Sequence, residues 1–297
     1  MTDIWTLLRA PIGLLALIVA TQFVLAAPSF SRSLTGKEPC FTALDAQAVI
    51  ADCTKHLKSS RHDKRVRASL LTYRGLAHFM AEDEARAIKD LDDAIATDPS
   101  HPGTHVNRGT VRLDLDDIRG AEKDFKEAIR IHPGHPRALY GLAQIDETRG
   151  DFGSAVAKMD AVFSALGGLK KNRPLQLSML LVRAKMLFQI PDEQPRALKD
   201  YDRILKLDRK NLEAITNRSI VLRRLGRPAD ALKGLDRGLK IAPNEPQLKI
   251  FRIAALHDLG RADEAHAALE QALEEHPDNA DLKKLMAASE KDAAAGR

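Results

Sequence analysis

The sequence predicts an all-α solenoid of repeated helix-turn-helix units, and two features of the 297-residue chain support this prediction. The first is a ladder of alanines spaced 34 residues apart, the length of one such unit. The second is that glycines and prolines recur in the same phase, which predicts about six units. The alanines are Ala87, Ala121, Ala155, Ala197, Ala231 and Ala265, and the phased pairs are Gly75 with Gly109, Pro99 with Pro133, Gly226 with Gly260 and Pro243 with Pro277.

Each unit is expected to contain a first and a second helix. Prolines such as Pro99 end the second helices, because the residue before a proline is driven out of helical geometry. Glycines such as Gly150 lie between the two helices of a unit, where a left-handed residue ends a helix. The first helices are predicted at 67–81, 102–115, 136–149, 176–190, 210–225 and 244–259, and the second helices at 84–97, 118–131, 152–165, 195–207, 228–241 and 262–275.

The recurring residues also predict how the helices pack. Two helices approach to about 8 Å only where the side chains at the crossing are small, so the recurring alanines are expected at the crossings. A large side chain follows each alanine by one helical turn and is expected to fill the core. These large residues are Leu91, Phe125, Met159, Tyr201, Leu235 and Leu269.

The pattern resembles the tetratricopeptide repeat family, in which small residues, a large apolar residue and a proline recur at set positions. The second unit, counted from Pro102, is the best match and supplies Gly109, Ala121, Phe125, Ala128 and Pro133. The resemblance implies a right-handed superhelix of paired helices that binds peptides or proteins.

The spacing breaks once, between Ala155 and Ala197, which stand 42 residues apart. The surplus falls in a Gly-rich, basic segment at residues 166–174. The favoured interpretation is a lengthened loop after a longer second helix. The alternatives are a hinge between two three-repeat halves and a loop that contacts the partner.

The two ends of the array have their own patterns. Residues 27–65 read as an extended lead-in followed by a partial repeat, with a helix at about 44–57. Residues 66–297 form the array itself. Its tail, 279–297, reads as a helix with Leu282 and Leu285 on one side and charges on the other, as a polar-backed cap requires.

An apolar run at residues 12–27 precedes the array. It is short for a membrane-spanning helix and suits a secretory signal peptide, with residues 1–26 removed and Ala27 the first mature residue. The alternative is an uncleaved anchor in the inner membrane. Either way the repeats are expected outside the cytoplasm, in the periplasm or secreted.

Cysteine usage agrees with export, because the chain has only Cys40 and Cys53. An even pair close in sequence in an exported chain is most simply a disulfide. The bond would hold the partial repeat to the lead-in.

Composition and motifs favour neither a nucleic-acid binder nor an enzyme. The net charge is only +5 and aromatic residues make up 4% of the chain, without the basic face and stacking aromatics of nucleic-acid binders. No catalytic, metal or cofactor motif is present. Histidines beside prolines are interpreted as polar turn residues, namely His101, His132, His135 and His276.

The family resemblance implies a binding surface on the inner face of the first helices. Asn107 and Asn217 are expected to pair with the backbone of an extended peptide, or simply to hydrate an open groove. The residue pattern does not match that of the family members that bind C-terminal carboxylates. The implied binding residues are Tyr73, Asn107, Arg137, Tyr140, Gln144, Arg183, Asn217, Arg224 and Phe251.

These features together predict a non-enzymatic, protein- or peptide-binding scaffold or adaptor in a bacterial cell envelope, without a cofactor. The alternative is a structural scaffold tethered to the inner membrane by the uncleaved N-terminal helix. Neither prediction identifies the partner or the oligomeric state.

Overall fold

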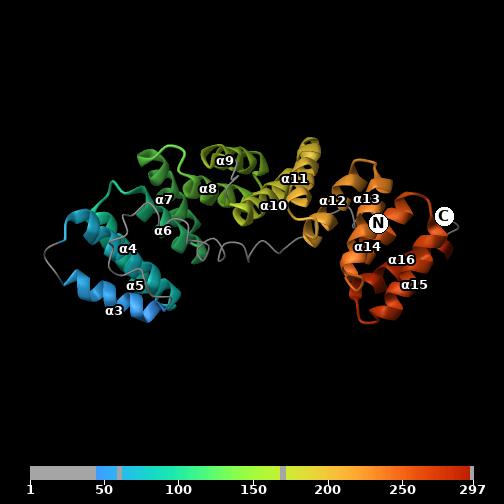
Figure 1. Cartoon of the computed structure of the whole chain (residues 1–297), viewed down its shortest axis with the longest axis horizontal. Helices are drawn as coiled ribbons and strands as arrows, with labels where there is room; N and C mark the ends of the chain where they lie inside the picture. Colours follow the sequence, from blue (N-terminus) through green and yellow to red (C-terminus); the bar gives the residue numbers. More distant parts are fainter. Residues whose placement is uncertain (1–44, 59–61, 168–171, 295–297) are drawn as a thin grey trace. The chain divides into compact units, whose positions relative to one another are not determined.

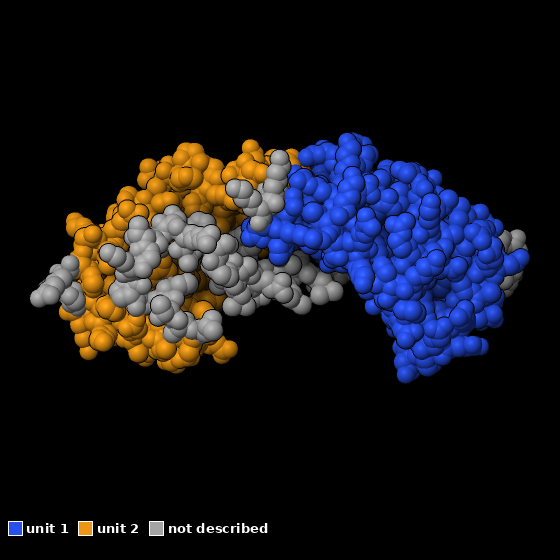
Figure 2. Space-filling model, viewed as in Figure 1, with its two compact units in different colours: residues 1–13, 169–297 blue, residues 14–168 orange. Residues whose placement is uncertain are grey.

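A computed structural model describes residues 45–58, 62–167 and 172–294, and within these ranges the regular structure is helical (Figure 1). The chain divides into two compact units, with the boundary between Gly168 and Leu169 (Figure 2). The described part of the N-terminal unit is 45–167, and that of the C-terminal unit is 172–294. Each unit is a stack of helix pairs in which successive helices pack against each other.

The N-terminal unit holds a partial repeat and three complete repeats. Its helices are α3 (Ala46–Leu57), α4 (Lys64–Met80), α5 (Glu84–Thr97), α6 (Pro102–Asp114), α7 (Ile118–Ile131), α8 (Pro136–Thr148) and α9 (Phe152–Ala165).

The C-terminal unit holds three more repeats and a terminal helix. Its elements are α10 (Arg173–Gln189), the short 3-10 helix η3 (Pro191–Glu193), α11 (Gln194–Leu207), α12 (Leu212–Arg224), α13 (Pro228–Ile241), α14 (Pro246–Asp258), α15 (Ala262–Glu275) and α16 (Ala280–Ala294). The predicted fold class, an all-α solenoid of helix-turn-helix units, is confirmed.

Short-range signals set the helix ends. Asp83, Asp117 and Asp151 precede α5, α7 and α9, and each carboxylate accepts a hydrogen bond from a first-turn backbone N–H. Prolines stand in the first turn of α6, α8, α13 and α14, where the missing N–H costs no helical hydrogen bond. Helices α5, α7, α9, α13 and α15 begin and end at the predicted residues.

The predicted core is also confirmed. The alanine of each repeat is buried, as is the large residue one turn later, from Leu91 to Leu269. Phe125 shows why small residues are needed, since its ring lies against Gly109 and Gly141, and a Cβ at Gly141 would overlap the ring. Close packing of this kind leaves no room for an added methyl group.

The extra residues in the irregular interval between Ala155 and Ala197 lie in different elements from those predicted. The expected longer second helix is wrong, because α9 has 14 residues, like the other second helices of the described repeats. The additional residues lengthen the connection after α9, extend α10 to 17 residues and insert η3 before α11. Residues 168–171 of the expected loop lie outside the described ranges, and the boundary between the two units falls there.

The predictions for the N-terminal 44 residues fall outside the described ranges, so the signal peptide, its cleavage before Ala27 and the pairing of Cys40 stay predictions. The second cysteine, Cys53, is buried in α3 against Leu70 of α4, which confirms that α3 packs on the array. No helix among the described residues is long and apolar enough to cross a membrane.

The turn between the two helices of a repeat predicts a stabilising substitution. Gly150, Gly226 and Gly260 have φ between 70° and 75° in this turn, whereas Glu82 and Asp116 hold φ of 60° and 62° at the same place in the first two repeats. A left-handed conformation costs a residue with a side chain about 1–2 kcal/mol. Glu82→Gly is therefore expected to raise the free energy of unfolding by about 1 kcal/mol, measured by urea denaturation.

Asp116→Gly should stabilise less than Glu82→Gly, because Asp tolerates the left-handed region better. The matched control is Gly150→Ala, whose added Cβ would meet no atom within 4 Å. It should destabilise by about 1 kcal/mol through backbone conformation alone. Gly150→Ala at wild-type stability would contradict this account of the turn.

Candidate functional site

Arginine and aspartate side chains join the two helices of several repeats. Arg74 of α4 donates through Nε and Nη2 to the two carboxylate oxygens of Asp90 in α5, both at 2.7 Å. Arg183 of α10 donates to both carboxylate oxygens of Asp200 in α11 in the same way, at 2.8 and 2.7 Å. Bidentate contacts of this kind fix the orientation of the two side chains as well as their distance, so they hold the two helices of a pair in register.

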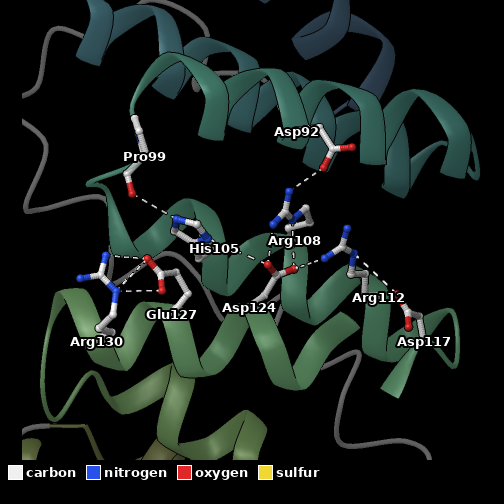
Figure 3. A network of polar contacts seen from close by, with 9 residues as sticks. All are labelled: Asp92, Pro99, His105, Arg108, Arg112, Asp117, Asp124, Glu127 and Arg130. Atoms are coloured by element: carbon white, nitrogen blue, oxygen red, sulfur yellow. Dashed lines mark hydrogen bonds and ion pairs between the residues drawn. The ribbon is translucent and has the colours of Figure 1, made fainter. Parts of the chain in front are cut away.

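Asp124 of α7 is the centre of the largest such cluster (Figure 3). Arg108 of α6 donates to both carboxylate oxygens, at 3.0 and 2.6 Å, and Nη1 of Arg112 donates to Oδ2 at 2.8 Å. Nδ1 of His105 lies 3.9 Å from Oδ1. Burial alone would raise the pKa of Asp124, but His105 and the two guanidinium groups outweigh it and lower that pKa.

Another set of ion pairs links successive repeats. In each pair, a first-helix arginine donates to an aspartate on the second helix of the preceding repeat. The pairs are Arg108 with Asp92 at 2.7 Å, Arg218 with Asp202 at 2.6 Å and Arg252 with Asp236 at 2.7 Å. Sequence reasoning missed these contacts, although the recurring separation of 16 residues between Arg and Asp was a readable signal.

Three of the predicted binding residues are partly exposed polar side chains on the first helices of the N-terminal unit. Asn107 of α6 and Arg137 and Gln144 of α8 are partly exposed, and their side chains make no hydrogen bond or ion pair with any described residue. Helices α6 and α8 are in direct contact. Burial lowers the pKa of Arg137, so this guanidinium is partly removed from water without an acidic partner among those residues. We call Asn107, Arg137 and Gln144 the first-helix surface.

Two further predicted residues of this unit pack inward: Tyr73 is partly buried, and Tyr140 lies in the core. Tyr73 packs against the buried cluster around Cys53 and Leu70. Tyr140 is 5% exposed, and burial raises its pKa to about 12. Because a buried ring has little surface to offer a partner, the assignment of Tyr140 to side-chain recognition is corrected here.

In the C-terminal unit, two more predicted residues have partners or surroundings within the fold. Arg183 is engaged by Asp200, and Phe251 is 1% exposed within the core. Arg224 is partly exposed and stacks over the ring of Phe188, 4.0 Å from its centroid. Asn217 is partly exposed and has no side-chain partner among the residues described. Thus Asn217 and Arg224 remain candidate partner-binding residues of the C-terminal unit. They are not part of the first-helix surface of the N-terminal unit.

The histidines next to prolines are structural where their contacts are described. His135 Nδ1 accepts a hydrogen bond from the N–H of Ala138 at 3.4 Å and so caps α8, and burial lowers the pKa of His135 to about 4. His101 Nδ1 lies 3.1 Å from Oγ1 of Thr104 in the first turn of α6. Within the described ranges, no group of three or more His, Cys, Asp or Glu side chains could hold a metal ion.

The chemistry of the first-helix surface is that of recognition. The Asn107 and Gln144 amides can each donate and accept hydrogen bonds, as the backbone of an extended peptide requires. The Arg137 guanidinium can bind a carboxylate through two hydrogen bonds. The surface therefore carries both neutral and cationic hydrogen-bonding groups.

Comparison with known proteins finds similarity to tetratricopeptide repeat proteins. The sequence profile described as tetratricopeptide repeat matches residues 106–166 and 255–287. No curated protein sequence matches the chain. Solved structures that resemble it include YrrB, a TPR protein with an unusual peptide-binding site, at 14% identity and a TM-score of 0.56. That alignment covers 66% of this chain and 96% of YrrB.

Two other solved structures align over more of the chain. PilF of Pseudomonas aeruginosa is 13% identical, with 75% of this chain and 98% of PilF covered and a TM-score of 0.56. The C-terminal part of a TPR repeat-containing protein from Cytophaga hutchinsonii is also 13% identical, with coverages of 80% and 93% and a TM-score of 0.61.

The fold and the first-helix surface define a helical-repeat protein of the kind that presents a binding surface across stacked helices. The matched segments and the shared fold support tetratricopeptide repeats as the structural units of this chain.

Proposed function

We propose that this protein is a non-catalytic scaffold that binds a peptide or protein partner on its first helices, with the first-helix surface of the N-terminal unit as the principal contact. The observation that carries the proposal is Arg137, a partly desolvated cation without an ion-pair partner among the described residues. Other arginines that bridge helices in this unit, such as Arg74 and Arg108, have aspartate partners. A carboxylate of the bound polypeptide would supply the corresponding partner for Arg137.

The neighbouring amides support an extended polypeptide as the ligand. Asn107 and Gln144 present donors and acceptors on the two helices that meet at this surface, unpaired within the described ranges. Asn107 and Gln144 would pair with the peptide backbone, and Arg137 would select for an acidic side chain. YrrB, which has this fold and a peptide-binding site, is a precedent for a ligand of this kind.

We further propose that the protein acts in a bacterial cell envelope, after export directed by residues 1–26. The support is the apolar run at 12–27 and the presence of only two cysteines, Cys40 and Cys53, close together in the sequence. N-terminal sequencing of protein from fractionated cells should find Ala27 first. Intact residues 1–26 in the membrane fraction would favour the tethered scaffold instead.

Site-specific photo-crosslinking in cells tests the binding surface. A crosslinking amino acid at Asn107 is expected to trap a partner, whereas the same residue at Lys123, exposed on α7, should not. An Asn107→Ala, Arg137→Gln double variant should retain the partner about tenfold less well, because each lost hydrogen bond costs on the order of 1 kcal/mol and a charged one more. Its melting curve should stay close to that of the wild type, because both side chains are partly exposed and make no hydrogen bond or ion pair with a described residue.

Two outcomes would refute the assignment. One is a double variant that melts normally and retains every partner. The other is crosslinking at Lys123 that equals crosslinking at Asn107, because it would place the partner on the second helices of this unit.

A further inference from the structure

The outer faces of α11 and α13 carry two rows of exposed cations in repeat phase. The first row is Lys199, Arg203 and Lys206, and the second is Lys233, Arg237 and Lys240, each residue 34 positions after its counterpart. All six side chains are exposed. Spacings of three and four residues place each row on one face of its helix. The helices occupy the same place in successive repeats, so both rows face the same side of the C-terminal unit.

These cations are not neutralised within the part of the chain that the structure describes. None of the six makes an ion pair or hydrogen bond through its side chain. The nearby acids are already engaged: Asp202 by Arg218, Asp236 by Arg252 and Asp230 by Arg227. The two rows therefore present a concentrated positive field to the solvent.

The second row also borders a hollow beside the start of α15. Its cationic lining consists of Lys233, Arg237 and Lys240, together with Arg261, which is paired with Glu264. Leu232 and Leu259 add apolar surface to the same hollow. Its one acid, Asp236, is held by Arg252. A ligand that fits this hollow must bring negative charge and apolar groups together.

We propose that the outer face of α11 and α13, which we call the basic face, docks an acidic polypeptide segment that carries apolar side chains. Carboxylates of the segment would lie along the two cationic rows, and an apolar side chain would enter the hollow against Leu232 and Leu259. A nucleic-acid backbone brings charge without apolar groups, and no aromatic residue lines the hollow to stack a base. A lipid surface would meet the exposed rows but not a recessed apolar site.

The proposal is tested with the full chain and a labelled synthetic peptide in which Glu residues are interspersed with Leu at helical spacing. Fluorescence anisotropy is expected to show salt-sensitive binding, since exposed charges are screened over about 10 Å at 0.1 M salt. Lys233→Glu, Arg237→Glu, Lys240→Glu should weaken binding at least about tenfold, mainly through the association rate. The corresponding triple on α11 should weaken it less, because the hollow borders α13.

Three controls separate the explanations. Lys64→Glu, Arg119→Glu, Lys123→Glu makes the same change in net charge with exposed cations of the N-terminal unit and should bind like the wild type. Adding the α13 triple to the Asn107→Ala, Arg137→Gln background should cause the same fold-loss of binding as it causes in the wild type, which separates the basic face from the first-helix surface. A peptide of Glu alone should bind more weakly than the Glu–Leu peptide. A melting curve for each variant verifies folding.

Several results would overturn the proposal: no binding by the wild type, equal losses from the N-terminal control and the α13 triple, or equal losses from the two rows. Tighter binding to phosphatidylglycerol vesicles or duplex DNA than to the peptide, lost on charge reversal of α13, would also overturn it by assigning the face to that ligand.

Discussion

Asp258→Ala is expected to destabilise the C-terminal unit by about 3–5 kcal/mol, because it removes a carboxylate that forms an ion pair with a buried arginine. The Arg223 side chain is completely buried at the end of α12, and its Nε donates to Oδ2 of Asp258 at 2.6 Å. The contact joins the first helices of two successive repeats, so its loss should loosen the C-terminal unit specifically. Hydrogen exchange of α12 and α14, together with urea denaturation, measures both effects.

The double variant Arg223→Met, Asp258→Leu is the control for this prediction. Replacing both partners with apolar side chains removes the unpaired charge, so most of the lost stability should return. If Asp258→Ala is as stable as the wild type, Arg223 does not depend on this carboxylate. A double variant as unstable as Asp258→Ala would assign the loss to packing.

Asp124→Ala is expected to destabilise the N-terminal unit by about 3 kcal/mol, the second large effect. The Asp124 side chain is 2% exposed and accepts hydrogen bonds from Arg108 and Arg112. Both arginines are partly exposed and keep a second acid nearby, Asp92 or Asp117, which places the effect at the lower end of the range for buried pairs. Thermal or urea denaturation measures the change.

The matched control is Asp92→Ala, which removes the other partner of Arg108. Asp92 is about half exposed, and exposed ion pairs contribute roughly 0–1 kcal/mol. A loss as large as that of Asp124→Ala would contradict the assignment of the effect to burial.

The pH dependence gives an independent check on Asp124. Its pKa is lowered in the folded protein from the ordinary value of 3.8, so the unfolded chain binds more protons as the pH falls through that region. Its contribution is therefore present above pH 3.8 and is lost as the pH falls through the folded pKa. Asp124→Ala should have a flatter stability profile there than the wild type, in parallel acid titrations.

The helices were predictable because their signals are local and recur. Aspartate caps and first-turn prolines act within one helical turn. Because the pattern recurs every 34 residues, the helix ends predicted in one repeat can be compared with those in the others. The prediction of helix lengths was wrong where the 34-residue spacing is interrupted. In the single irregular interval, the sequence did not reveal that α10 rather than α9 is lengthened.

The candidate site was less predictable, since a repeat position does not specify its surroundings. Tyr140 and Arg137 share the same first helix, yet one is buried and the other is partly exposed without an ion pair among the described residues. Arg183 occupies the same repeat position as Asn107 and Asn217, but Asp200 lies within its reach. Such outcomes depend on side chains from neighbouring helices, which periodicity alone does not specify.

The sequence by itself determined the repeat length, the helix-pair architecture, the core residues and the resemblance to tetratricopeptide repeats, because each follows from local preferences and the spacing of small and large side chains. The tertiary structure decided which polar residues are available to a partner. Availability depends on the distance between charges on different helices, so packing assigned Arg74, Arg108 and Arg183 to aspartates. It left Asn107, Arg137 and the six cations of the basic face without such partners among the described residues.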